Sequence, residues 1–262
     1  MTWSRAGRRS LEGLGRSVSS ATLFRVPVFP PTRHSVIERL RTPGDAGRTE
    51  AFGDLVAGYW KPVYKYLRVR WRLGPEEAED VTQALFAEAF ENAWFDRFDP
   101  EKARFRTFVR LCVDRLVMNA QQAAARIRRG GGQPVLSIDF AGAEHELAIQ
   151  VPGAPEAEDF FKREFVRALF TRAVRSLRRD CLARGREIHW QLFERYDLGP
   201  EDRPSYADLA AAFDLTPGQV TGYLAQARRT FRMQTIAELK TLCGSEEEFR
   251  REARDLLGLE IE

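Results

Sequence analysis

Residues 205–232 read SYADLAAAFDLTPGQVTGYLAQARRTFR, and this stretch predicts two short helices joined by a tight turn. Ser205 is placed to cap the first helix, and Asp208 stands where the second member of a capping box belongs. Thr216 and Gln219 occupy the same two positions of the second helix, with a proline at its first helical residue. Two helix starts this close together predict a helix–turn–helix pair.

The apolar residues of this segment lie on one face of each predicted helix. They are Leu209, Ala210 and Phe213 in the first helix and Val220, Leu224 and Phe231 in the second. Burying these faces against each other leaves the first turn of the second helix free to enter a groove of DNA. An ordinary αα-hairpin in a helical bundle is the alternative, but Arg228, Arg229 and Arg232 favour contact with DNA.

The composition is that of a globular protein with an uneven charge distribution. The 262 residues are 44% hydrophobic and 30% charged, with a formal net charge of +3. Residues 1–33 contain six arginines and one acidic residue, whereas residues 245–262 contain seven acidic residues and three arginines. Basic segments of this kind can contact nucleic acid even when the whole chain is nearly neutral. The length allows one large domain or two of moderate size.

Cysteine spacing and hydropathy indicate the compartment. The cysteines at 112, 181 and 243 are more than 60 residues apart, which predicts neither a disulfide framework nor a zinc site. We therefore expect a reducing, cytoplasmic environment. No apolar run approaches the roughly 18 residues of a membrane span, so no membrane insertion is expected. The Arg- and Ser-rich N-terminus superficially resembles a transit peptide, but its prolines would interrupt an amphipathic helix, which favours a disordered basic extension.

Apolar residues recur at helical spacing through most of the remaining chain. Besides the two helices of residues 205–232, the predicted helices cover residues 51–72, 75–94, 104–129, 158–184, 188–196 and 245–257. Glycines after residue 129 predict a tethering linker with some contacts, in which residues 135–138 are expected to be a short extended piece that docks on a neighbouring element. The predicted fold class is all-α, with two helical domains. Its parts are a basic, disordered extension over 1–45, a helical domain over 46–129, a flexible linker over 130–157, a helix–turn–helix domain over 158–240 and an acidic C-terminal helix over 241–262.

Segments of the first helical domain resemble those of a known family. The sequence EAEDVTQALF at 77–86 is similar to an acidic Asp-x-x-Gln-x-x-Phe helix. Residues 59–73 resemble the helix that precedes it, and FRTFV at 105–109 resembles a Phe-x-x-Trp-Leu helix start. In this order, and followed by a helix–turn–helix, these segments resemble the sigma factors of bacterial RNA polymerase, specifically the extracytoplasmic-function group of the sigma-70 superfamily. The resemblance covers residues 50–129 and 160–235 and implies a region 2-like domain followed by a region 4-like domain.

The resemblance implies that core RNA polymerase is a partner and that the acidic helix binds it. The implied polymerase-binding residues are Glu79, Asp80, Gln83 and Phe86. An exposed carboxylate beside an amide offers directional acceptor and donor groups to a partner surface. The alternative for these charges is a solvated helix face.

The resemblance also implies promoter DNA as a partner, melted by the loop and helix that follow. The residues implied at the −10 element are Phe95, Asp96, Arg97, Phe98, Arg104, Arg106, Arg110 and Arg115. Arginines that contact phosphates are interleaved here with rings that can hold unstacked bases, and the loop at 95–98 is expected to capture a flipped base. The alternative places these rings in the core, as we expect for Phe105 and Phe108.

The helix–turn–helix is expected to bind the −35 element. The implied residues are Thr216, Gln219, Thr221, Tyr223, Gln226, Arg228 and Arg229. Glutamine can pair with adenine, and arginine with phosphate or guanine. Gly218 and Gly222 lower the stability of the second helix of this pair. In the helix implied in promoter melting, Arg115 and Asn119 stand where the family commonly has Asn and Asp. These departures predict weak or unusual promoter recognition.

The expected function is therefore that of a sigma factor that directs promoter recognition and melting. The alternative is a helix–turn–helix regulator, or a sigma-like adaptor, without promoter melting. An enzyme, a cofactor and a metal are not expected, because the sequence shows no Gly-rich phosphate loop, catalytic acid pair, metal-ligand spacing or nucleophile motif. The resemblance adds an anti-sigma factor or another regulator as a further candidate partner.

The oppositely charged ends of the chain suggest a regulatory hypothesis. Counting Lys and Arg against Asp and Glu, residues 1–33 have a net charge of +5 and the segment after Gly244 has −4. The acidic helix could therefore lie over a basic DNA-contacting surface and compete with DNA. The alternative is structural, with Phe249, Leu256 and Leu257 packing this helix on the C-terminal domain.

Overall fold

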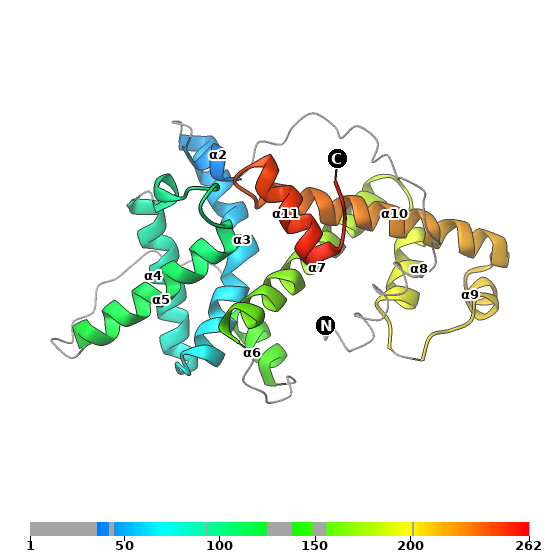
Figure 1. The fold of residues 1–262 in the computed structure, drawn as a ribbon. Coiled ribbons are helices and arrows are strands. Elements are labelled where there is room, and N and C mark those ends of the chain that lie inside the picture. Colours follow the sequence, from blue (N-terminus) through cyan, green and yellow to red (C-terminus); the bar gives the residue numbers. More distant parts are fainter. Residues whose placement is uncertain are drawn as a thin grey trace. The chain divides into compact units, whose positions relative to one another are not determined.

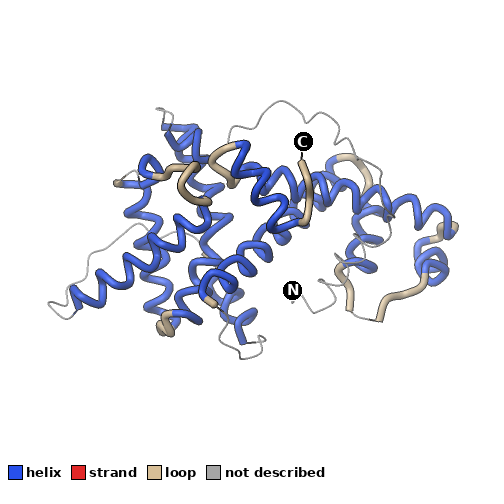
Figure 2. Tube along the Cα trace, in the orientation of Figure 1, coloured by secondary structure: helices blue, strands red, loops and turns tan. Residues whose placement is uncertain are grey.

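The computed structural model describes residues 36–41, 45–92, 94–124, 138–148, 156–200 and 202–261. Every regular element in these ranges is a helix, which confirms the predicted all-α class (Figure 2). Residues 1–35 of the predicted N-terminal extension, and residues 135–137 of the predicted extended piece, lie outside the described residues. The prediction of disorder up to residue 45 is wrong for residues 36–41, which form a helix whose apolar residues Val36, Ile37 and Leu40 are buried in the core.

The helices follow one another along the chain as labelled in Figure 1. They are α2 (Val36–Arg41), α3 (Asp45–Arg70), α4 (Pro75–Glu91), the 3₁₀ turn η1 (Trp94–Arg97), α5 (Phe105–Ala124), α6 (Phe140–Ala148), α7 (Ala157–Ala183), α8 (Glu187–Asp197), α9 (Tyr206–Phe213), α10 (Pro217–Thr241) and α11 (Glu246–Leu257).

The chain divides into two compact units. The described residues between Thr171 and Ala237 form the hairpin unit, and those between residues 36 and 170 and between residues 238 and 261 form the large unit. The unit boundaries lie within α7 and α10, so the first part of α7 and all of α11 belong to the large unit. The predicted domain boundaries instead lie at residues 157 and 240.

In the large unit, aromatic side chains of α3 pack against α5 and α7. The ring of Tyr59 lies 5.5 Å from that of Phe105 in α5 and 5.1 Å from that of Phe165 in α7. Tyr66 lies 5.6 Å from Phe161, again in α7. Because these rings are buried, they make α3 the central element of the core of this unit.

Helix α6 lies within the segment predicted to be a flexible linker, and that prediction is wrong for residues 140–148. The Phe140 ring packs 5.7 Å from Trp60 of α3. Glu146 accepts hydrogen bonds from Lys61 at 2.7 Å and from Lys65 at 2.6 Å. Lys65 is 1% exposed and also pairs with Glu164 of α7 at 2.9 Å. These contacts hold α6 on α3. The periodicity of apolar residues in the sequence does not reveal them.

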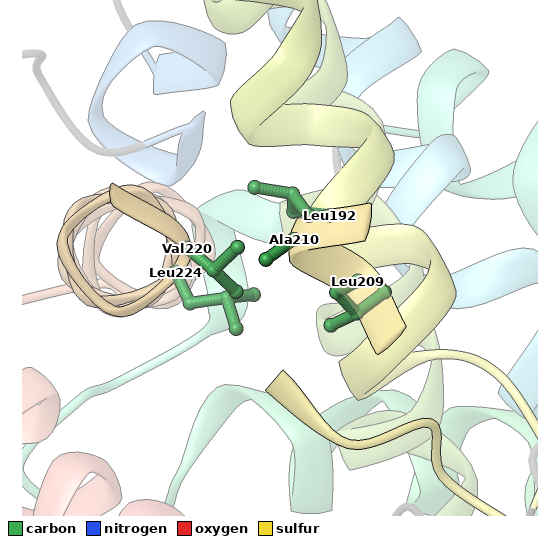
Figure 3. Close-up of a cluster of buried hydrophobic side chains, with 5 residues drawn as sticks. All are labelled: Leu192, Leu209, Ala210, Val220 and Leu224. Atoms are coloured by element: carbon green, nitrogen blue, oxygen red, sulfur yellow. The ribbon is translucent and has the colours of Figure 1, made fainter. Parts of the chain in front are cut away.

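The hairpin unit contains the two helices predicted from residues 205–232. Its buried cluster consists of Leu192, Leu209, Ala210, Val220 and Leu224, whose side chains meet between α8, α9 and α10 (Figure 3). The predicted capping box is present, because the backbone N–H of Asp208 donates to Ser205 Oγ at 3.1 Å and that of Ser205 donates to the Asp208 carboxylate at 3.0 Å. Local capping and the apolar faces together determine this hairpin.

Candidate nucleic-acid interface

The solvent-facing side of α4 is an acidic edge formed by Glu76, Glu77, Asp80 and Gln83. The first three are exposed, and Gln83 is half-buried, as is the neighbouring Glu79. Glu76 and Glu77 lie in the first turn of the helix, where the helix dipole stabilises their negative charges. Three of the four residues implied in polymerase binding therefore reach the surface.

Phe86 is the exception on α4. It is 2% exposed, and its ring lies 6.4 Å from that of Phe52 in an edge-to-face arrangement. The prediction that Phe86 contacts a partner is corrected, because the side chain belongs to the core of the large unit.

The loop between α4 and α5 also differs from the expectation. Phe95 is 5% exposed and Phe98 is 3% exposed, and their rings lie 6.0 Å and 5.0 Å from Phe105. In this conformation neither ring can stack on a base, because both fill the space around Phe105. Arg97 is exposed, and the side chain of Asp96 lies outside what the structure describes.

Beside this loop lies an open hollow of about 690 Å³ whose lining carries more positive than negative side chains. Its lining residues are Arg41, Arg97, Phe98, Asp99, Pro100 and Lys102. Arg41 donates to the carbonyl oxygens of Phe95, at 2.9 Å, and of Phe98, and so holds the loop backbone to α2. A hydrogen bond from Lys102 lowers the pKa of Asp99. The hollow presents more positive than negative charge, as an anion-binding surface does.

The arginines predicted to contact promoter DNA lie in three environments. Arg106 is 3% exposed and pairs with Glu252 at 2.9 Å, so its assignment as a DNA contact is corrected for this conformation. Arg104 and Arg110 are half-buried and paired with carboxylates. Arg115 is exposed on α5. Of the arginines predicted to contact promoter DNA, Arg97 and Arg115 are therefore the ones that lie exposed on the surface of this region.

Helix α11 belongs to the large unit, so the expectation that it packs on the C-terminal domain is wrong. Phe249 is 1% exposed. The carboxylate of Glu248 accepts hydrogen bonds from the backbone N–H of Phe105 and, at 2.7 Å, from that of Gly244. Burial raises the pKa of this carboxyl group. Glu248 thereby caps the start of α5, a contact between distant residues that sequence reasoning missed.

The first turns of α10 use several of their polar side chains locally. Gln219 Oε1 accepts from the backbone N–H of Thr216 at 2.8 Å, and Thr221 donates to the carbonyl of Pro217 at 2.9 Å. The Tyr223 ring stacks on His189 of α8 at 4.3 Å. These contacts stabilise the helix start, and Thr216, Gln219 and Thr221 remain exposed there.

Helix α8 supports the same face of α10. The Nε2 atom of His189 lies 3.0 Å from Oε1 of Gln226, and burial lowers the pKa of this imidazole. Gln226 is therefore half-buried against α8 and held by His189. Its predicted role in reading a base would require this contact to break.

Arg228 is a structural residue, which corrects its assignment as a DNA contact. Its guanidinium donates two hydrogen bonds of 3.0 Å to the Asp197 carboxylate and lies over the Tyr196 ring at 5.3 Å. Arg229 and Arg232, by contrast, are exposed. They continue an exposed stripe of small residues, Gly218, Gly222 and Ala225, along α10.

Comparisons of the chain with protein-family models, with curated proteins and with solved structures find no match. Within the described ranges, no helix is long and apolar enough to cross a membrane. The same ranges contain no group of three or more His, Cys, Asp or Glu residues placed to hold a metal ion.

Proposed function

We propose that this protein is a sigma factor that binds core RNA polymerase and directs promoter recognition and melting. The observation that carries the proposal is the acidic edge of α4. Asp80 is exposed and Gln83 is half-buried on a helix whose opposite face, which includes Leu85, is buried. Such a helix offers charge and amide groups in a fixed arrangement, which suits a docking surface.

The hairpin unit supplies the sequence-reading part of this proposal. Its second helix starts at an exposed, capped N-terminus and carries Arg229 and Arg232 farther along the same side. Exposed arginines on the outer face of such a helix suit contacts with phosphates. Gln219 and Thr221 are the exposed side chains of the first turns that can reach base edges.

The large unit supplies the surface for promoter melting. The cationic hollow beside η1 and the exposed Arg115 are its phosphate-contacting parts in this proposal. A protein with these partners acts in the cytoplasm, and its regulator is an anti-sigma factor or another protein that covers one of these surfaces.

A double substitution in the acidic edge tests the proposal. Asp80→Arg with Gln83→Ala should abolish co-purification with core polymerase, because charge reversal on a docking surface costs several kcal/mol. The matched control is Glu91→Arg with Asn92→Ala, which changes two exposed residues at the other end of α4. Circular dichroism checks that helical content is retained. Equal polymerase binding by the double mutant and the control would remove the basis of the proposal.

A second candidate function is a DNA-binding regulator or sigma-like adaptor without promoter melting. The burial of Phe95 and Phe98 favours it, because these rings are the ones expected to hold unstacked bases. Transcription from a duplex promoter and from the same promoter with a preformed bubble separates the two candidates. A sigma factor supports both reactions with core polymerase, whereas an adaptor without melting activity gives no transcript from the duplex promoter.

A further inference from the structure

Three cationic side chains of the large unit converge on one carboxylate of α11. Asp255 Oδ2 accepts from Arg104 Nη1 at 2.6 Å and from Arg106 Nη2 at 2.9 Å. Its other oxygen, Oδ1, accepts from Lys162 Nζ at 2.5 Å. Two guanidinium groups and an ammonium group arranged around a pair of oxygens are also the donor set that binds a phosphate.

Most of the negative charge at this cluster comes from α11. Glu252 pairs with Arg104 and with Arg106, each at 2.9 Å, and Asp255 pairs with all three cations. The remaining carboxylate, Glu158 of α7, pairs with Arg106 at 3.3 Å. If the last turn of α11 moved away, Lys162 would lose Asp255, and Arg104 would keep only its ion pair with Glu252.

The two halves of α11 are held differently. In the first half, Phe249 is buried and Ser245 caps the helix. The residue before the cap, Gly244, lies so close to Phe98 that a Cβ atom at position 244 would be 2.5 Å from that ring. In the last turn, which follows the buried Ala253, the Asp255 side chain is 27% exposed and held by ion pairs. Ion pairs at partly exposed positions are weak and are screened by salt. The last turn can therefore exchange with another anion while the first half stays packed.

We propose that Arg104, Arg106 and Lys162 form a phosphate-binding site for DNA, and that Asp255 occupies this site in the free protein. DNA replaces Asp255 on the three cations, whereas Glu252, whose side chain is 3% exposed, stays on Arg104 and Arg106. The C-terminal helix thus competes with DNA at one defined place. This inference rests on the DNA-binding part of the proposed function and adds Lys162, which lies outside the residues implied by the family resemblance.

Two variants that remove the same charge from α11 test the competition. Asp255→Asn removes the one carboxylate that pairs with all three cations, whereas Glu247→Gln changes an exposed residue in the first turn of the helix. Binding of a labelled single-stranded oligonucleotide is measured by fluorescence anisotropy over a range of salt. We expect D255N to bind about 5-fold more tightly than E247Q at low salt, the size of effect that a partly exposed ion-pair network provides. The gain should shrink as salt screens the pairs.

Removing a cation from the site should reverse the gain in DNA affinity that we expect for D255N. Adding Lys162→Ala to D255N should lower its affinity more than adding Arg163→Ala, which removes an exposed charge one residue away. Hydrogen exchange of the unmodified protein provides a readout that does not depend on the stability of a variant. DNA should accelerate exchange at residues 255–259 and leave residues 249–253 protected.

Equal binding by D255N and E247Q, or unchanged exchange at residues 255–259 in the DNA complex, would overturn the inference and leave the proposed function intact. If neither the unmodified protein nor D255N binds DNA, the inference and the DNA-binding part of the proposed function both fail. Co-purification with core polymerase reports on the remaining part, so the failures are distinguishable.

Discussion

Arg228 and Arg229 are neighbours in the sequence but lie in different environments. Arg228 is paired with Asp197, whose side chain is only 7% exposed, and it also covers the Tyr196 ring. Arg229 is exposed. At the scale of the residue, the same side chain therefore stabilises the hairpin unit at one position and is available to a partner at the next.

We expect an alanine substitution at one of these positions to change protein stability and at the other to change DNA binding. Arg228→Ala should lower the free energy of unfolding by about 2 kcal/mol, because it leaves the buried Asp197 carboxylate without its bidentate partner. Arg229→Ala should leave stability within about 0.5 kcal/mol and weaken DNA binding with a flatter salt dependence. Urea denaturation and salt-dependent binding measure the two effects. Similar stability losses in both variants would contradict the assignment of Arg228.

At the scale of the element, α6 is held on α3 by two carboxylates. The hydrogen bond from Arg68 is the main cause that lowers the pKa of Glu144. Burial alone would raise the pKa of Glu146, but hydrogen bonds from Lys61 and Lys65 outweigh it and lower this pKa. A carboxyl group with a lowered folded-state pKa stabilises the fold above its unfolded pKa, and this contribution is lost as pH falls through the folded pKa.

The docking of α6 should therefore depend on acid pH. We expect it to be complete at neutral pH and to weaken as pH falls below about 4, where unpaired Glu protonates. Hydrogen exchange at residues 140–148, corrected for the intrinsic effect of pH, measures the release. Glu144→Gln should weaken docking already at neutral pH, whereas the control Glu156→Gln, at an exposed residue before α7, should leave it unchanged. Protection that does not change with pH would show that apolar contacts of Phe140 alone hold the helix.

At the scale of the whole molecule, the large unit is assembled from two separate parts of the sequence. Residues 238–261 complete a unit that otherwise consists of residues 36–170. Phe249 and Ala253 of α11 are buried in it, and Arg251 donates to the carbonyl of Pro100 at 2.9 Å. The C-terminus therefore contributes to the core that positions the loop before α5.

Truncation should affect the two units unequally. A chain that ends at Gly244 should lose at least about 3–5 kcal/mol of stability in the large unit, the cost of emptying a buried Phe site such as that of Phe249. A chain that ends at Leu257 keeps α11 and is the control. Hydrogen exchange should show lost protection at residues 51–67, with a smaller change at residues 206–231. Equal loss in both regions would mean that α11 does not act on the large unit in particular.

Several features of the fold follow from interactions between residues close in the sequence. The Ser205–Asp208 capping box, the Thr216–Gln219 pair and the apolar faces around Leu209 depend on residues three or four positions apart. Such contacts are set by helix geometry, so they could be predicted without a structure. The all-α class and the positions of the main helices follow from the same local signals.

The tertiary structure alone decided which of the predicted site residues are accessible. Arg106 meets Glu252 across 146 positions of the chain, and Phe95, Phe98 and Phe86 fill a core whose shape depends on several helices. The helix at 140–148 and the placement of α11 depend on matching charges from distant segments. A sequence pattern reports which face of a helix is apolar, but burial of an arginine or a phenylalanine depends on what packs over it, and that is a property of the assembled chain.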